Sequence, residues 1–85
     1  MADIDTEPVC ELHLRIAGQP HDLMLRLHGR QPTEDEVAGW MRDGAVVRLQ
    51  VTETAGRTPH TMLVNFSTIV FAWLCPYQSG RGVNL

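Results

Sequence analysis

Two segments near the start of the chain place apolar residues at every second position, strictly alternating with polar residues in 10–16, and this alternation constrains the fold most. A period of two is typical of β-strands with one buried face. Residues 18–21, Gly-Gln-Pro-His, separate the two segments and favour a turn. The segments are therefore predicted to pair as an antiparallel hairpin. The apolar positions are Cys10, Leu12, Leu14 and Ile16 in residues 10–16, and Leu23, Leu25 and Leu27 in residues 22–28.

Folding the chain at residues 18–21 predicts which residues of the hairpin lie opposite each other. Ile16 falls opposite Leu23, and Leu14 falls opposite Leu25. Every apolar residue then meets another apolar residue across the strands. A slip by one residue would turn each apolar side chain to the wrong face, so the assignment of faces is strongly specified.

A short helix is predicted after the first hairpin. Residues 33–36 read Thr-Glu-Asp-Glu, which is a capping-box pattern, and their acids suit the positive end of a helix dipole. Val37 and Trp40 then share one side of the helix. Gly44 suits the left-handed conformation that commonly ends a helix. The helix is therefore expected to span about residues 34–42.

A second hairpin is predicted from residues 46–53 and 60–66, joined by a loop at residues 54–59. The same test of the register places Leu49 opposite Val64. Apolar residues again meet apolar residues, so this hairpin also has one inner and one outer face.

The last predicted strand, residues 69–74, is apolar on both faces. Ile69, Phe71 and Trp73 occupy one face, and Val70, Ala72 and Leu74 occupy the other. A strand of this kind is usually buried on both sides. One face suits the core of the sheet, whereas the other requires the helix, a second sheet or another protein molecule. The pattern leaves these alternatives open.

The element order β-β-α-β-β-β predicts an α+β domain with two antiparallel hairpins, a fifth strand and one short helix. The domain is expected to span residues 9–75. A flexible acidic lead at residues 1–8 and a flexible tail at residues 76–85 are expected to flank it. The pattern does not decide whether the sheet stays open or closes into a small barrel.

The break at Asn65–Thr68, followed by a strand that begins with Ile69 and Val70, resembles one passage of the Sm-like and SH3-like small barrels. In those families a short helical turn joins the fourth strand to the fifth. The resemblance implies a small-barrel fold and transfers no functional residue. The chain lacks the motif glycines of those families, and its helix follows the second strand, whereas the Sm helix comes first.

Composition narrows the classes of function. The chain has 85 residues and a net charge of −3, and its seven basic residues are all arginines. An acidic domain is a poor candidate for a general nucleic-acid binder. The sequence shows neither an apolar signal-peptide region nor an apolar run of membrane-spanning length. We therefore expect a soluble cytoplasmic protein whose cysteines are reduced.

Residue spacing favours neither a metal site nor a catalytic site. The histidines and cysteines match no metal-binding motif, and the serines lie in no nucleophile motif. Cys10 lies on a predicted core face, where a thiol is unreactive. The acidic residues gather at the helix start and in the N-terminal lead. We therefore expect no catalytic residue, no metal and no cofactor.

Polar residues on the outer faces of the strands form the first candidate site. The first hairpin carries a local group of basic side chains, and a residue of the third strand joins it if the strands are adjacent. Such a group could bind an acidic partner or a phosphate-bearing ligand, or it could be an ordinary solvated face. The residues are His13, Arg15, Arg26, His28 and Arg48.

Apolar residues without an obvious place in the core form the second candidate site. Large aromatic residues often anchor protein interfaces. The alternative is that the helix or a closed barrel covers them. The residues are Trp40, Leu63, Phe71 and Trp73.

The sequence thus favours a non-catalytic protein-interaction module. It would form a homo-oligomer, most simply a homodimer, or serve as an accessory subunit of a bacterial complex. The alternative from another class is a small-barrel protein that binds nucleic acid or a phosphate ligand through its basic sheet face.

Overall fold

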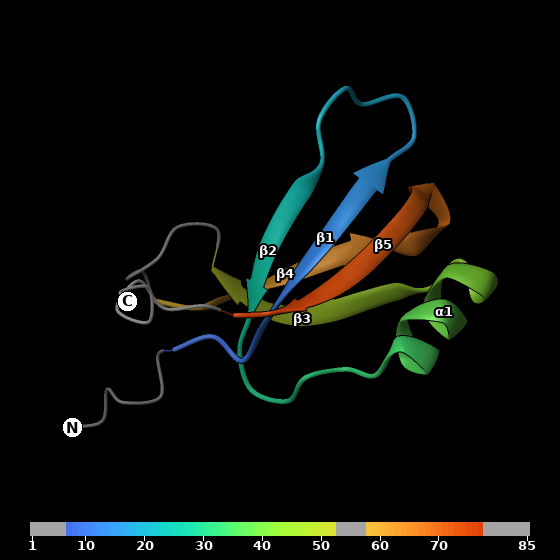
Figure 1. Ribbon diagram of the computed structural model, residues 1–85. Coiled ribbons are helices and arrows are strands. Elements are labelled where there is room, and N and C mark those ends of the chain that lie inside the picture. The colour runs from blue at the N-terminus through green and yellow to red at the C-terminus, as the bar shows by residue number, and fades with distance from the viewer. Residues whose placement is uncertain (1–6, 53–57, 78–85) are drawn as a thin grey trace.

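The computed structural model describes residues 7–52 and 58–77, which form five strands, one α-helix and a one-turn 3-10 helix (Figure 1). The predicted α+β class and element order are confirmed. The lead at residues 1–6, most of the second hairpin loop and the tail at residues 78–85 lie outside the described residues. The elements are β1 (Cys10–Ile16), β2 (Leu23–Leu27), α1 (Glu34–Asp43), β3 (Val46–Thr52), β4 (His60–Asn65), η2 (Phe66–Thr68) and β5 (Ile69–Pro76).

The strands form one antiparallel sheet in the order β4-β3-β2-β1-β5. The junction between β2 and β3 is short and consists of the pairs Arg26–Thr52 and Leu27–Val51. Figure 1 shows β3 and β4 crossing behind β1, β2 and β5, so the sheet bends sharply at this junction. Among the described residues no pairing joins β4 to β5, and closure into a barrel therefore stays a prediction.

The register of the first hairpin differs from the predicted one by two residues. Leu14 lies opposite Leu23. The turn falls at residues 16–19, where the N–H of Gln19 donates to the carbonyl of Ile16 at 3.0 Å. Gly18, the third residue of this turn, has φ +83°, which glycine adopts without a steric penalty. Residues 18–21 lie in the loop between β1 and β2 as predicted, but the hydrogen-bonded turn lies two residues earlier than the predicted register requires, so that register is wrong.

The second hairpin is also shifted by two residues from the prediction, because Leu49 lies opposite Met62 and not Val64. A shift by two keeps every side chain on its own face. Both hairpins therefore have the inner and outer faces that the alternation predicted, although the individual partners differ.

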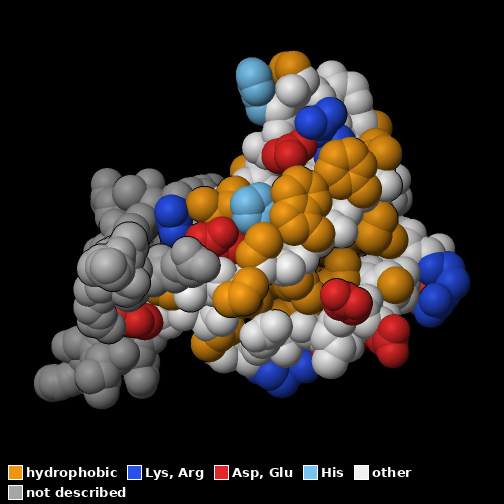
Figure 2. Space-filling model, in the orientation of Figure 1, with side chains coloured by type: hydrophobic (Ala, Val, Ile, Leu, Met, Phe, Trp, Pro, Cys, Tyr) orange, Lys and Arg blue, Asp and Glu red, His pale blue; other side chains and the backbone are white. Residues whose placement is uncertain are grey.

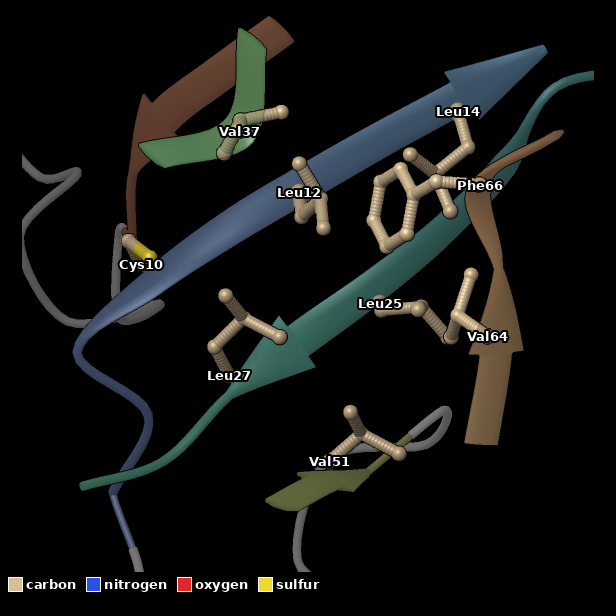
Figure 3. Packing of buried hydrophobic residues seen from close by; sticks show 9 residues of the cluster. All are labelled: Cys10, Leu12, Leu14, Leu25, Leu27, Val37, Val51, Val64 and Phe66. Atoms are coloured by element: carbon tan, nitrogen blue, oxygen red, sulfur yellow. The ribbon is translucent and has the colours of Figure 1, made fainter. Parts of the chain in front are cut away.

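The core lies between the inner face of β1 and β2 and the side chains that β3, β4 and η2 turn toward it. Figure 3 shows Phe66 and Val64 pointing at the leucines of β1 and β2. The predicted inward residues of both hairpins are therefore largely confirmed as core. The buried cluster consists of Cys10, Leu12, Leu14, Leu25, Leu27, Val37, Val51, Val64 and Phe66.

Helix α1 begins with the predicted capping box. The Thr33 hydroxyl accepts from the N–H of Glu36 at 3.0 Å, and the Glu36 carboxylate accepts from the N–H of Thr33 at 2.9 Å. Arg30 donates to both oxygens of that carboxylate at 2.9 Å. Hydrogen bonds from Arg30 and then from Thr33 lower the pKa of Glu36 to about 2. The ring of Trp40 packs on Phe66 at 5.3 Å and ties the helix to the core.

Strand β5 is an edge strand that pairs with β1. Ala72 and Leu74 pack against the core, while Phe71 and Trp73 are 42% and 41% exposed. The predicted burial on both faces is therefore not achieved within the single chain. Pro76 ends β5 and belongs to the sheet, although the sequence placed it in the tail.

Candidate functional site

Four side chains form a continuous row on the outer face of β1 and β5. His13 lies opposite Trp73 and stacks on its ring at 4.8 Å and 15°. Phe71 stacks on Trp73 at 5.6 Å, and the guanidinium carbon of Arg15 lies 5.4 Å from the centroid of the Phe71 ring. We call Arg15, Phe71, Trp73 and His13 the aromatic row. The two predicted sites, one polar and one apolar, thus meet in one surface.

The antiparallel pairing of β1 and β5 builds this row. Side chains alternate between the faces of a strand, so Arg15 and His13 share the outer face of β1, as Phe71 and Trp73 share that of β5. The register then brings each basic residue to the side of one aromatic ring. The contact between the Arg15 cation and the exposed Phe71 ring contributes about 0.5–1 kcal/mol. This contact and the stacking of His13 on Trp73 hold the rings in place without burying them fully.

Carboxylates accompany the basic residues of the aromatic row. The Arg15 guanidinium forms an ion pair with Asp22, and a His13 ring nitrogen lies 3.2 Å from the Glu11 carboxylate. Arg26 of β2 lies opposite Glu11 on the same face. Figure 2 shows hydrophobic surface surrounded by basic, acidic and histidine side chains. The outer face therefore carries charges of both signs around an aromatic centre.

Sequence reasoning missed the role of Asp22. Asp22 was assigned to the start of the second strand, and the predicted register placed Met24 opposite Arg15. With the observed turn at residues 16–19, the position opposite Arg15 is Asp22. Gly18 adopts the positive φ that this turn requires at its third position. A glycine at residue 18 is the sequence signal that could have placed the turn at residues 16–19.

His28 belongs to the packing between strands. Its Nε2 lies 3.1 Å from the hydroxyl of buried Thr52, and its Nδ1 is buried without a hydrogen bond among the described residues. Burial lowers the pKa of His28. Its backbone N–H donates to the carbonyl of Gln50, so the residue connects β2 to β3. It does not lie in the aromatic row.

Three other predicted site residues lie away from the aromatic row. Arg48 of β3 faces Leu63 of β4, and Leu63 is 63% exposed at the opposite edge of the sheet. Trp40 lies half-buried against Phe66. The structure therefore brings together part of each predicted site and separates the rest.

Cysteines and possible metal ligands within residues 7–52 and 58–77 were predicted to carry no site. Cys10 is buried, and burial, followed by the nearby Cys75 and Glu11, raises the pKa of its thiol. In those ranges no group of three or more His, Cys, Asp and Glu side chains could hold a metal ion. Among the same residues no helix is long and apolar enough to cross a membrane.

Comparison with known protein families, curated proteins and solved structures found no match to this chain. Function is therefore inferred from the geometry and charge of the outer face.

Proposed function

We propose that the chain is a non-catalytic protein-interaction module that forms a homodimer through the aromatic row. The observation that carries this proposal is the pair of neighbouring rings on edge strand β5. Phe71 and Trp73 are 42% and 41% exposed although they stack on each other. Aromatic residues of this kind anchor interfaces when a partner covers them. A small domain also gains much from such completion, because its own core is small.

The charge pattern favours a second copy as the partner. In a two-fold dimer the same patch meets itself, so it must be complementary to itself. The Arg15–Asp22 ion pair and the Glu11 carboxylate beside His13 place both signs beside the rings. Rotation by a half-turn can then bring a basic side chain of one copy to an acidic side chain of the other. If the chain is instead an accessory subunit of a bacterial complex, the aromatic row would contact a different subunit of that complex.

Sedimentation equilibrium at micromolar concentrations tests the proposed dimer. We expect a dimer for the wild-type chain and a monomer for Phe71→Ser, because the substitution removes one of the two central rings. Leu63→Ser is the matched control, since Leu63 is an exposed apolar residue on β4 at the other edge of the sheet. It should leave the dimer unchanged. A strictly monomeric wild-type chain would overturn the proposal.

A nucleic-acid or phosphate-ligand binding protein is the second candidate, favoured by the basic groups that stack on exposed rings. Proteins that bind single strands use such rings to stack bases. The carboxylates of Asp22 and Glu11 weaken this candidate, because Asp22 already pairs with Arg15 and Glu11 places a negative charge beside His13. Titration with a fluorescein-labelled oligonucleotide separates the two functions. Phosphate-driven binding falls steeply with salt and should be lost when Arg15 and Arg26 are both changed to Ser. An aromatic dimer interface responds little to salt.

A further inference from the structure

The free edge of β5 is a second surface that the proposed dimer does not use. β5 ends the strand order, and β1 occupies one of its two edges. No strand among the described residues pairs with the other edge. The N–H and C=O groups along such an edge can accept an additional strand.

A hollow of about 330 Å³ lies along this edge. On the β5 side the consecutive residues 72–74 line it, and on the other side Val37, Ala38 and Met41 of α1 line it. Figure 1 shows α1 on the side of β5 away from β1, so a hollow between α1 and residues 72–74 lies toward the free edge. Helix α1 forms its far wall and leaves room between the helix and the strand.

A second hollow, of about 470 Å³, continues the first. Residues 74–77 line it together with Val9, which precedes β1, and residues 31–34 line its other side. The two hollows share Leu74 and Glu34 and therefore adjoin each other, and we call the two together the edge trough. The trough follows residues 72–77. At the rise of a strand this is roughly 20 Å, the length of a six-residue extended segment.

Glu34 supplies the charge of the edge trough where the two hollows meet. Among the described residues it takes part in no ion pair, whereas the nearby Glu36 is paired with Arg30 and Asp43 with Arg42. A basic side chain in the occupant would complement this carboxylate. The chain's other edge strand, β4, contains neither Lys nor Arg. β5, the edge strand itself, also contains neither Lys nor Arg. A second copy that paired either of its edge strands with β5 would therefore leave Glu34 without a cation.

We propose that the edge trough binds an extended segment of a different protein, which adds to β5 as a further strand. Alternate apolar side chains of this segment would pack against Val37, Ala38 and Met41, and a Lys or Arg would meet Glu34. The interaction goes beyond the proposed dimer because it uses the free edge of β5, although Trp73 belongs to the aromatic row and also lines the first hollow. Backbone hydrogen bonds would supply affinity, and the apolar wall and Glu34 would supply specificity.

Selection from a phage library of random dodecapeptides on the immobilised chain tests the proposal. We expect enriched sequences with apolar residues at alternate positions and one Lys or Arg. The synthetic peptide is then titrated by fluorescence polarisation. Ala38→Arg should weaken binding at least tenfold, because the new side chain fills the trough and pairs with Glu34 four residues earlier. Ala17→Arg is the matched control, since Ala17 is exposed in the first hairpin turn and lines neither hollow.

Amide hydrogen exchange of the complex distinguishes strand addition from other modes of binding. Backbone amides of β5 should become protected when the selected peptide is bound. The proposal fails if no peptide is enriched, if Ala38→Arg binds as well as the wild-type chain, or if binding leaves β5 unprotected. It also fails if Ala38→Arg dissociates a dimer that Phe71→Ser leaves intact, because the occupant would then be a second copy. Phe71→Ser should retain the peptide, so failure of the dimer and failure of the trough are separate results.

Discussion

Phe66 connects helix α1 to both layers of the bent sheet, and its removal should be among the most costly single changes in the chain. The side chain is 1% exposed and packs on Trp40 at 5.3 Å. Replacing a buried Phe with Ala costs about 3–5 kcal/mol, because the apolar contacts are lost and a cavity remains. A chain of 85 residues has a free energy of unfolding of about 4–13 kcal/mol. Phe66→Ala should therefore remove a large part of the stability.

Urea denaturation followed by tryptophan fluorescence measures this effect. With a slope of about 1–3 kcal/mol per molar, the midpoint should fall by about 2 M. Phe66→Leu keeps most of the apolar volume and should cost about 1–2 kcal/mol, part of it from the lost ring pair with Trp40. A double-mutant cycle with Trp40→Leu isolates that part. A loss below about 1 kcal/mol for Phe66→Ala would refute the central position of this residue in the core.

Four further outcomes are expected from urea denaturation. Burial lowers the pKa of His28, so the unfolded chain binds a proton at this residue more readily than the folded chain does. The free energy of unfolding should therefore be highest above about pH 6.5 and should decrease as the pH falls below that value. His28→Gln should flatten the dependence of stability between pH 7.5 and 5.5, and an unchanged slope would contradict this. Gly44→Ala should cost about 1–3 kcal/mol, because Gly44 has φ +62° and a new Cβ would lie 3.2 Å from Ser67. Gly39→Ala, in the helix interior, should instead stabilise by about 0.5–1 kcal/mol; destabilisation equal to that of Gly44→Ala would refute the conformational argument. Thr33→Ala should cost about 1 kcal/mol through the lost cap, and no loss would show that the cap is not needed.

Local signals in the sequence were sufficient for the elements and their faces. The alternation in residues 10–16 predicted which side of β1 is buried, and Leu12 and Leu14 are fully buried as expected. The Thr33 capping box and the Gly44 cap predicted both ends of α1 to within one residue. These features depend on backbone geometry within a few residues, so they can be deduced without knowing the rest of the fold.

The candidate site was only partly accessible from the sequence. The residues of the aromatic row were all named in advance, but they were divided between a polar and an apolar group. The two groups lie side by side because β5 pairs with β1, and these strands are far apart in the chain. The ion pair of Arg15 with Asp22 was missed because the turn lies two residues earlier than the Pro20 region indicated.

The sequence by itself therefore determined the elements, their inward faces and an excess of apolar surface on the last strand. Alternation specifies the face of every residue, but it is equally satisfied by registers that differ by two. Only the tertiary structure decided the partners across the strands and the position of β5 at the edge beside β1. That position leaves Phe71 and Trp73 on an open outer face and opens a trough against α1, because nothing among the described residues pairs with the free edge of β5.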